Sequence, residues 1–521
     1  MANLVTEVGS TAEERPESSA VVLGDHRFDY AELWEEIGAF ADGLRAAGVE
    51  SGDRVALYLP NLPQFVIAFH GTLRAGGVVV PMNPQYKPRE ITHLLNDSGA
   101  SVVVSLADLV PYVEAVWDDT DVETLVTVGD ETDAGTQFEA FLGDPEFETV
   151  ERADDDVACQ PYTSGTTGQP KGVLLTHENL RSNAAQSASL MPGGEIRPDD
   201  RMLGVLPLFH IYGMTVTMNA TLFDGGTYMP LPSWDVEQAL DVIESAGVTV
   251  FHGVPAMYND IVNTDTEGER DLSGLRLCGV GGSGIPEEVL RRFEELYDTT
   301  IYEGYGLTET SPVTHFNTPD EGRRVGSIGK TLPGVDAMVV DDEFEPVDPV
   351  PEGPIDEDET DLDEITGEIV VSGRNVTKGY NDRPAANEAS FTHRDGKRWF
   401  HTGDVGYHDE DGFYYVVDRE KHVIVTGGYN VYPREVEELL FEHEAVADAA
   451  VVGIPDERRG ETVKAFVVPR PDADVTPDEI RDYCLDQLAE YKHPREVEFV
   501  EELPRTTTGK VQKFELVDRE N

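Results

Sequence analysis

Hydrophobic positions follow two alternating patterns near the start of the chain. Over residues 28–80, Leu33, Ile37, Phe40 and Leu44 are spaced as on one face of a helix, with acidic residues mostly between them. A short apolar stretch follows (GDRVALYLPN), then a second helical pattern (PQFVIAFHGTLRAGG) and another apolar stretch (VVVPMNP). Helical patterns alternating with short apolar runs predict a mainly parallel β-sheet covered by helices.

Similar units return later in the chain, at residues 235–254 and in the stretch LRLCGVGGSGIPEEVLRRFEELY. Between residues 341 and 365 there are thirteen acidic residues, four prolines and no lysine or arginine. This composition predicts a solvated loop between strands, with no catalytic role. The glycine-punctuated stretches after it, GEIVVSGRNVTKGY and WFHTGDVGYHDEDGFYYVVDR, read as further strands.

The character of the chain changes near Arg419. From there on it holds 14 of the 39 basic residues and begins a compact pattern of strands and a helix, KHVIVTGGYNVYPREVEELLFEHEAVADAAVVGI. With 521 residues, the chain also exceeds the size at which single cores stop growing. We therefore predict an N-terminal domain over residues 1–418 and a small C-terminal domain over residues 419–521.

Charge and cysteine content narrow the class of protein. There are 101 acidic residues against 39 basic ones, a net charge of -62, which disfavours nucleic acid and anionic membranes as partners. The composition resembles that of halophilic proteins, for which salt screens self-repulsion. Cys159, Cys278 and Cys484 lie far apart and predict reduced thiols. With neither a signal-like N-terminus nor an apolar run of membrane length, we expect a cytoplasmic protein without membrane insertion.

The stretch YTSGTTGQPKGVLLTH at residues 162–177 is the first candidate for chemistry. An NTPase P-loop requires Ser or Thr after its lysine and then a helix, whereas Lys171 is followed by Gly172 and a strand-like run. What remains is a loop of glycines, hydroxyls and one cation, which can surround phosphate oxygens. The alternative for such a run taken alone is a surface turn.

The full string resembles the phosphate-loop signature [ST]SGTTGxPKG of the adenylate-forming enzymes, the superfamily of acyl-CoA synthetases, luciferases and peptide-synthetase adenylation domains. The resemblance continues in order from about Phe28 to Lys510, nearly the whole chain. It implies that the loop binds the phosphates of ATP. The residues this assigns are Thr163, Ser164, Gly165, Thr166, Thr167, Gly168 and Lys171.

Two further segments resemble motifs of the same superfamily. In LPLFHIYG, His210 matches the histidine beside the acyl cavity. GGSGIP and YEGYGLTET resemble the segments around adenine and the reacting carboxylate, assigning Gly281, Gly282, Gly304, Tyr305 and Gly306 to the nucleotide and Thr308 and Glu309 to catalysis. The resemblance implies that Mg²⁺ contacts Glu309 and Thr163; these are the hard oxygen donors that this ion prefers.

The C-terminal motifs complete the resemblance. Asp404 and Arg419 match the residues that bind ribose, and a carboxylate and a guanidinium suit its hydroxyls. Lys421 matches the hinge position, and Gly427 and Gly428 match the segment that admits the pantetheine arm of coenzyme A. Lys510, in PRTTTGKVQK, matches the catalytic lysine.

The resemblance implies an α/β fold with a large N-terminal domain of helix-covered sheets, a β-barrel-like subdomain and a small mobile α+β C-terminal domain. It also implies an ATP-dependent acid–CoA ligase. The acid attacks the α-phosphorus of ATP and releases pyrophosphate, then the small domain turns about Lys421 and the thiol of CoA displaces AMP. The expected cofactors and substrates are ATP, Mg²⁺, CoA and a small carboxylic acid, handled by a monomer or homodimer.

The sequence says least about which carboxylic acid is activated and which thiol accepts the acyl group. The chain ends eleven residues after Lys510 without a carrier domain, so free CoA is the expected acceptor. Gly306 stands where acetate-specific members carry tryptophan, and GRNVTKGY resembles fatty-acyl and coumarate-type ligases, so we expect a medium- or long-chain fatty acid. An aryl-CoA ligase, a standalone adenylation enzyme that loads a carrier protein and a non-catalytic nucleotide-binding protein remain as alternatives.

Overall fold

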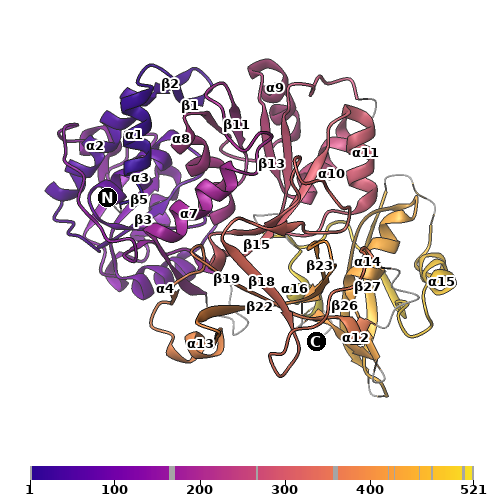
Figure 1. The fold of residues 1–521 in the computed structure, drawn as a ribbon. Helices are drawn as coiled ribbons and strands as arrows, with labels where there is room; N and C mark the ends of the chain where they lie inside the picture. Colours follow the sequence, from indigo (N-terminus) through magenta and orange to yellow (C-terminus); the bar gives the residue numbers. More distant parts are fainter. Residues whose placement is uncertain are drawn as a thin grey trace.

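The computed structural model describes residues 3–163, 170–265, 268–355, 362–419, 422–426, 429–456, 458–470, 473, 475–506 and 511–518. Three groups of strands precede residue 420 and one follows it (Figure 1). Within this part of the chain the helices are α1 (Thr6–Glu14), α2 (Tyr30–Ala46), α3 (Pro63–Arg74), α4 (Pro88–Ser98), α5 (Val110–Glu114), α6 (Phe138–Phe141), α7 (His177–Ala188), α8 (Ala220–Asp224), α9 (Val236–Ala246), α10 (Pro255–Thr264), α11 (Glu287–Tyr297), α12 (Leu362–Ile365), α13 (Pro384–Ala389), α14 (Pro433–Glu442), α15 (Pro477–Gln487) and α16 (Lys513–Asp518).

Two large sheets form the N-terminal part, and both are mainly parallel as predicted. The first runs in the order β17-β16-β15-β14-β13-β11-β12-β1-β2 and the second in the order β20-β10-β8-β4-β3-β5-β6-β7, with β9 paired to β10. Their strands are β1 (Ser19–Leu23), β2 (His26–Asp29), β3 (Arg54–Tyr58), β4 (Val78–Pro81), β5 (Ala100–Leu106), β6 (Thr124–Val128), β7 (Thr136–Gln137), β8 (Val157–Cys159), β9 (Tyr162–Thr163), β10 (Lys171–Thr176), β11 (Arg201–Gly204), β12 (Thr227–Pro230), β13 (Val250–Gly253), β14 (Leu277–Val280), β15 (Ile301–Gly306), β16 (Val313–Phe316), β17 (Lys330–Thr331) and β20 (Gly379–Tyr380).

The helices cover these sheets in layers. One core joins residues of both sheets with the apolar faces of α2 and α3, so these helices lie between the sheets. A second core packs α9, α10 and α11 on the far side of the first sheet, and a third packs α4 and α5 on the far side of the second. The predicted helical face of Leu33, Ile37, Phe40 and Leu44 is fully buried in α2, which begins with a reciprocal capping box between Asp29 and Glu32.

An antiparallel sheet follows, in the order β18-β19-β22-β21 with β23 paired to β22. Its strands are β18 (Val335–Val340), β19 (Gly367–Gly373), β21 (Phe391–Arg394), β22 (Lys397–His408) and β23 (Tyr414–Arg419). A bridge between Gly329 and Tyr414 joins this sheet to the segment just before β17. The acidic stretch does connect β18 to β19, but it also contains the short helix α12; residues 356–361 lie outside the described ranges.

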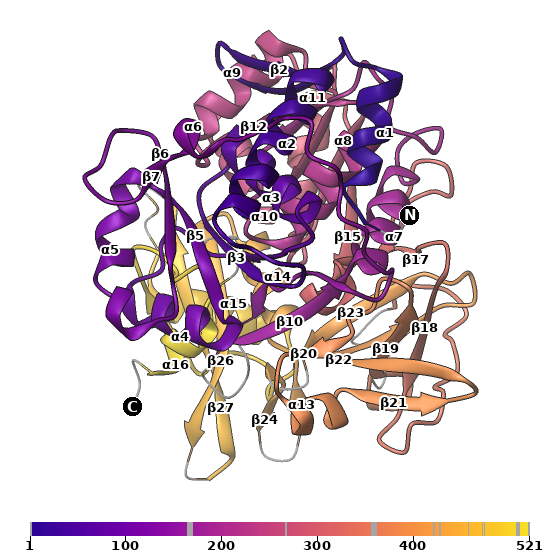
Figure 2. The ribbon, with the colours of Figure 1, turned by 90° about the vertical axis from the view of Figure 1, so that its left-hand side faces the viewer.

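The C-terminal part has a sheet of its own, in the order β25-β24-β27-β26 with β28 paired to β27. Its strands are β24 (Ile424–Thr426), β25 (Tyr429–Val431), β26 (Val446–Asp456), β27 (Gly460–Pro469) and β28 (Glu496–Phe499). Two apolar cores lie wholly within residues 424–517, against α14, α15 and α16. Figures 1 and 2 show this yellow part beside the orange antiparallel sheet. Helix α14 also contacts α11.

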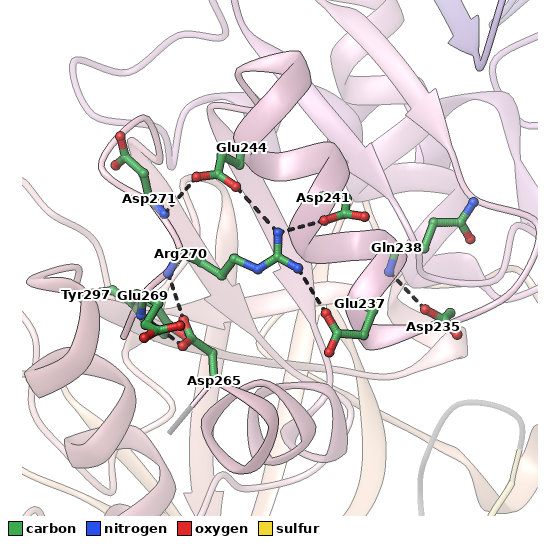
Figure 3. Close-up of polar contacts among 10 residues, drawn as sticks. All are labelled: Asp235, Glu237, Gln238, Asp241, Glu244, Asp265, Glu269, Arg270, Asp271 and Tyr297. Atoms are coloured by element: carbon green, nitrogen blue, oxygen red, sulfur yellow. Dashed lines mark hydrogen bonds and ion pairs between the residues drawn. The ribbon is translucent and has the colours of Figure 1, made fainter. Parts of the chain in front are cut away.

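The surface and thiols agree with the composition. All three cysteines are buried and free. Among the described residues, no helix is long and apolar enough to span a membrane. On the exposed face of α9, Arg270 contacts three acidic side chains: Glu237 at 2.9 Å, Asp241 at 2.6 Å and Glu244 at 3.5 Å (Figure 3).

Candidate active site

The candidate phosphate loop connects two paired strands. Thr163 ends β9 and Lys171 begins β10, and the two residues face each other across an antiparallel pair. The run after Lys171 is a strand, which confirms the prediction that excluded an NTPase P-loop. Ser164, Gly165, Thr166, Thr167 and Gly168 lie outside the described residues.

Lys171 and Glu309 both interact with the side chain of Tyr380. The Lys171 Nζ atom lies 5.4 Å from the ring centre of Tyr380. The Tyr380 hydroxyl donates a hydrogen bond of 2.9 Å to Glu309 Oε1. Burial raises the pKa of Glu309, while Tyr380 and Arg419 act in the opposite direction. A cation placed beside a buried carboxylate stabilises its ionised form.

Mg²⁺ fits the chemistry of this corner. Glu309 offers a carboxylate oxygen and Thr163 a hydroxyl, both hard donors. Within the described ranges, no group of three or more His, Cys, Asp and Glu side chains could hold a metal.

Asp404 and Arg419 meet across the β22–β23 pair, where they are direct partners. Asp404 Oδ1 accepts from Arg419 Nε at 2.8 Å, and Asp404 Oδ2 accepts from the Tyr305 hydroxyl at 2.5 Å. Burial alone would lower the pKa of Arg419, but Asp404, Tyr305 and Glu309 raise it overall. An ionised carboxylate has about four lone-pair sites, so Asp404 can still accept from two ribose hydroxyls.

A cavity of about 470 Å³ opens beside this cluster. It lies at the carboxyl ends of β14 and β15, where open α/β sheets bind ligands. Of the predicted site residues, Gly282, Gly304, Tyr305, Gly306, Asp404 and Arg419 line it. Its other wall comes from the C-terminal part and includes Arg434, Val511 and Lys513.

Gly306 also has a structural role, besides the predicted one. A Cβ atom there would lie 1.9 Å from the carbonyl oxygen of Pro312 and 2.9 Å from Val313 Cα. On this backbone the close approach of β15 to β16 leaves no room for a larger residue at position 306. The expectation about the acid drawn from Gly306 stays a prediction.

His210 and Gly281 both lie next to Tyr212. His210 Nδ1 accepts from the backbone N–H of Tyr212 at 3.3 Å, at the start of the π-helix Tyr212–Asn219. A Cβ atom on Gly281 would lie 3.2 Å from the Tyr212 ring. Neither His210 nor Gly281 is among the residues that line the 470 Å³ cavity. The predicted position of His210 beside a bound acid therefore stays a prediction.

The remaining predicted residues, Lys421, Gly427, Gly428 and Lys510, lie outside the described ranges. Their neighbours are placed: Val511 pairs with Arg505, and both line the cavity. Thr308 is placed beside Glu309 in a short helical turn.

The sequence prediction missed three residues of this site. Tyr380 connects Lys171 to Glu309, and Glu303 and Arg434 line the cavity. Tyr380 ends GRNVTKGY, so its motif was visible although its contact was not. Glu303 had one available signal, a carboxylate within an otherwise apolar strand.

Comparison with known proteins agrees with this geometry. Residues 9–381 match the family described as AMP-binding enzyme, and residues 435–510 match the AMP-binding enzyme C-terminal domain. The chain is 35% identical to a long-chain-fatty-acid–CoA ligase of Bacillus subtilis over 97% of this chain and 92% of that one. It is 37% identical to a feruloyl-CoA synthase of Amycolatopsis over 96% of each chain.

Solved structures give the same result. ATP-bound MatB from Rhodopseudomonas palustris superposes with a TM-score of 0.90 at 32% identity, over 99% of this chain and 98% of that one. The same protein solved without nucleotide gives 0.78 over the same coverage. The chain therefore belongs to the AMP-binding enzyme family of the adenylate-forming superfamily, and it is an AMP-forming acid–CoA ligase.

Proposed function

We propose that this ligase activates a medium- or long-chain fatty acid as its adenylate and transfers the acyl group to free CoA. The observation that carries the assignment of roles is the electrostatic link between the cluster at the cavity and the one around Glu309, which does not itself line the cavity. Asp404, Arg419 and Tyr305 line it, and the influence of Arg419 on the pKa of Glu309 brings the second cluster within electrostatic range. One cluster suits a ribose and the other suits phosphates with their cation.

In the first step the acid oxygen attacks the α-phosphorus of ATP and the bond to pyrophosphate breaks. Asp404 accepts the ribose hydroxyls, while Tyr305 offers a ring face to adenine between Gly282 and Gly304. Lys171 and the loop after Thr163 hold the departing phosphates, and Lys510 neutralises charge that develops at the α-phosphate. Positioning and charge neutralisation supply most of the acceleration in such a reaction.

Mg²⁺, held by Glu309 and Thr163, would neutralise phosphate charge. The half-buried Glu309 supports this role because burial raises its pKa and so disfavours an uncompensated charge. Thr308, next to it, places a hydroxyl at the same corner.

In the second step we propose that residues 419–521 turn about Lys421. Lys510 would leave the nucleotide, and the segment around Gly427 and Gly428 would admit the thiol that displaces AMP. The separate apolar cores of residues 424–517 support a boundary after residue 418. The higher TM-score to ATP-bound MatB than to the same protein without nucleotide supports assigning the present arrangement to the first step.

Two acid classes are favoured by particular observations. The Bacillus subtilis relative, similar over nearly the full length of both chains, supports a fatty acid. The feruloyl-CoA synthase, slightly more identical, supports an aryl acid as the second candidate. Apolar lining residues such as Ala256, Ile285 and Val289 are compatible with either.

Carboxylate-dependent exchange of labelled pyrophosphate into ATP tests the proposal. Octanoate and palmitate are compared with ferulate and benzoate, followed by detection of the CoA thioester. Highest kcat/KM for the alkyl acids is the expected result, whereas a preference for ferulate or benzoate would replace the fatty acid by the aryl acid. Exchange without a CoA thioester would contradict free CoA as the acceptor, and no exchange with any acid would contradict the catalytic assignment.

A further inference from the structure

Arg434 joins the C-terminal part of the chain to the wall of the nucleotide cavity. It is the second residue of α14, and its Nη1 donates to the carbonyl oxygen of Val416 on β23 at 3.0 Å. Its backbone N–H donates to Asp418 Oδ2 at 3.3 Å, and its Nε donates to Glu438 at 2.9 Å. The guanidinium is therefore fixed from both parts of the chain.

The neighbouring Tyr432 packs at the same junction. It is 5% exposed and belongs to an apolar cluster that otherwise comes from residues 350–417, including Tyr415 and Val417. The start of α14 thus contacts the antiparallel sheet through the ring of Tyr432 and the guanidinium of Arg434. A planar guanidinium with several donors suits such a fixed geometry better than an ammonium group.

Gly284 provides the space that Arg434 occupies. A Cβ atom at position 284 would lie 2.7 Å from the Cζ and Nη2 atoms of Arg434. Contacts shorter than about 3 Å force one partner to move, and Arg434 cannot move without loosening its bonds to Val416 and Glu438. Gly284 lies between Gly282 and Pro286, in the segment that lines the cavity. The glycine and the arginine therefore fit each other across the junction.

Glu303 lies within electrostatic range of Arg434. Its side chain comes from β15 and it is 5% exposed. Burial raises its pKa to about 7, and the charge of Arg434 acts in the opposite direction. A buried carboxylate is strongly destabilising when its cationic neighbour is removed. Docking α14 elsewhere would take Arg434 away from Glu303, so the pair favours the present arrangement.

We propose that Arg434 is a positioning residue for adenylate formation, which docks the C-terminal part against Gly284 and β23 so that Arg505 and Val511 face the nucleotide cavity. Val511 and Lys513 already line this cavity beside Arg434. The inference rests on the proposed function, because it assigns the present arrangement to the first of two steps. Arg434 then acts through the placement of the C-terminal part and not by contact with the reacting atoms.

The test separates the two half-reactions in the full-length protein. Arg434→Ala should slow pyrophosphate exchange by roughly ten-fold or more, given the loss expected when one partner of a buried charged contact is removed. Gly284→Ala, on the opposite side of the junction, should slow it by roughly three-fold or more because its methyl group displaces the guanidinium. Both variants should form thioester from a supplied acyl-adenylate at the wild-type rate.

A double-mutant cycle gives the decisive measurement. In the Arg434→Ala background, Gly284→Ala should have no further effect, since the group it displaces is gone. Arg434→Lys should restore exchange only in part. Lys464→Met serves as the matched control, because it removes a buried cation whose ion-pair partners Glu496 and Glu498 both lie in the C-terminal part. It should leave the ratio of the two half-reaction rates unchanged.

Equal losses in both half-reactions, or additive effects of the two alanine substitutions, would overturn the positioning role. Unchanged exchange in Arg434→Ala would do the same while leaving the proposed function intact. A wild-type enzyme without exchange for any acid would instead refute the proposed function. Thermal unfolding of each variant identifies misfolded protein, and in that case Arg434→Lys and Gly284→Ala carry the test.

Discussion

Glu303 should make the stability of the protein depend on pH near neutrality. Burial raises the pKa of Glu303 from its ordinary 4.5 to about 7 in the folded chain. A carboxyl with a raised folded pKa contributes stability below its unfolded pKa and loses that contribution as pH rises through the folded pKa. At about 1.4 kcal/mol per pKa unit, the loss amounts to about 3 kcal/mol between pH 4.5 and 7.

Glu303→Gln removes this titration while keeping the shape of the side chain. With about 2 cal/mol/K of unfolding entropy per residue and 521 residues, 3 kcal/mol corresponds to roughly 3 °C in the unfolding midpoint. The variant should therefore match the wild type near pH 5 and unfold about 3 °C above it near pH 8. The reason is that the wild type alone keeps a charge in the buried site at the higher pH.

Calorimetry of both proteins across this pH range, at fixed high ionic strength, measures the difference in midpoint. Glu114→Gln changes an exposed carboxylate and should give a difference that does not vary with pH. A Glu303→Gln difference that stays constant, or that falls as pH rises, would refute the account of a desolvated carboxyl at this position.

Four other outcomes are expected. Asp404→Asn should raise the KM for ATP by about ten-fold or more in initial-rate assays, because an amide has one acceptor oxygen where the carboxylate has two; an unchanged KM would remove Asp404 from the ribose site. Tyr380→Phe should raise the Mg²⁺ concentration for half-maximal exchange by roughly five-fold, since Glu309 loses a hydrogen bond and its pKa rises further. An unchanged Mg²⁺ requirement would contradict the assignment of Glu309 as a metal ligand. Lys510→Ala should abolish pyrophosphate exchange and spare thioester formation from acyl-adenylate, and equal loss of both would contradict its assignment. Arg270→Met should lower the unfolding midpoint at low salt by leaving three acidic side chains of α9 uncompensated, and the gap should close as salt is added; a gap independent of salt would contradict an electrostatic origin.

Local pattern predicted much of the fold correctly. The burial of Leu33 and Phe40 follows directly from helical spacing, and the β3–α3–β4 alternation follows from the change of period along the chain. The strand after Lys171 was also predictable, because GVLLT is apolar and follows glycine. Such features depend on neighbours within a few residues, which is the range that sequence periodicity reports.

Contacts between distant segments account for what the sequence did not reveal. Tyr380 and Glu309 are 71 positions apart, and Arg434 on α14 lies against Gly284 in the loop between β14 and α11. Position 306 was compared with the tryptophan of acetate-specific members, and the structure adds that a Cβ atom there would meet the backbone of Pro312. No local sequence pattern reveals these contacts, because each depends on how close the fold brings two distant segments of the chain.

The cavity between β15 and α14 has a consequence for how ligand and structure depend on each other. Its walls belong to separately packed cores, one before residue 420 and one after it. A nucleotide that fills the cavity contacts both cores. Part of its binding free energy therefore stabilises the association of the N-terminal and C-terminal parts of the chain. Affinity for the nucleotide and resistance of the junction to proteolysis are then two measures of one equilibrium, and a change in either must appear in the other.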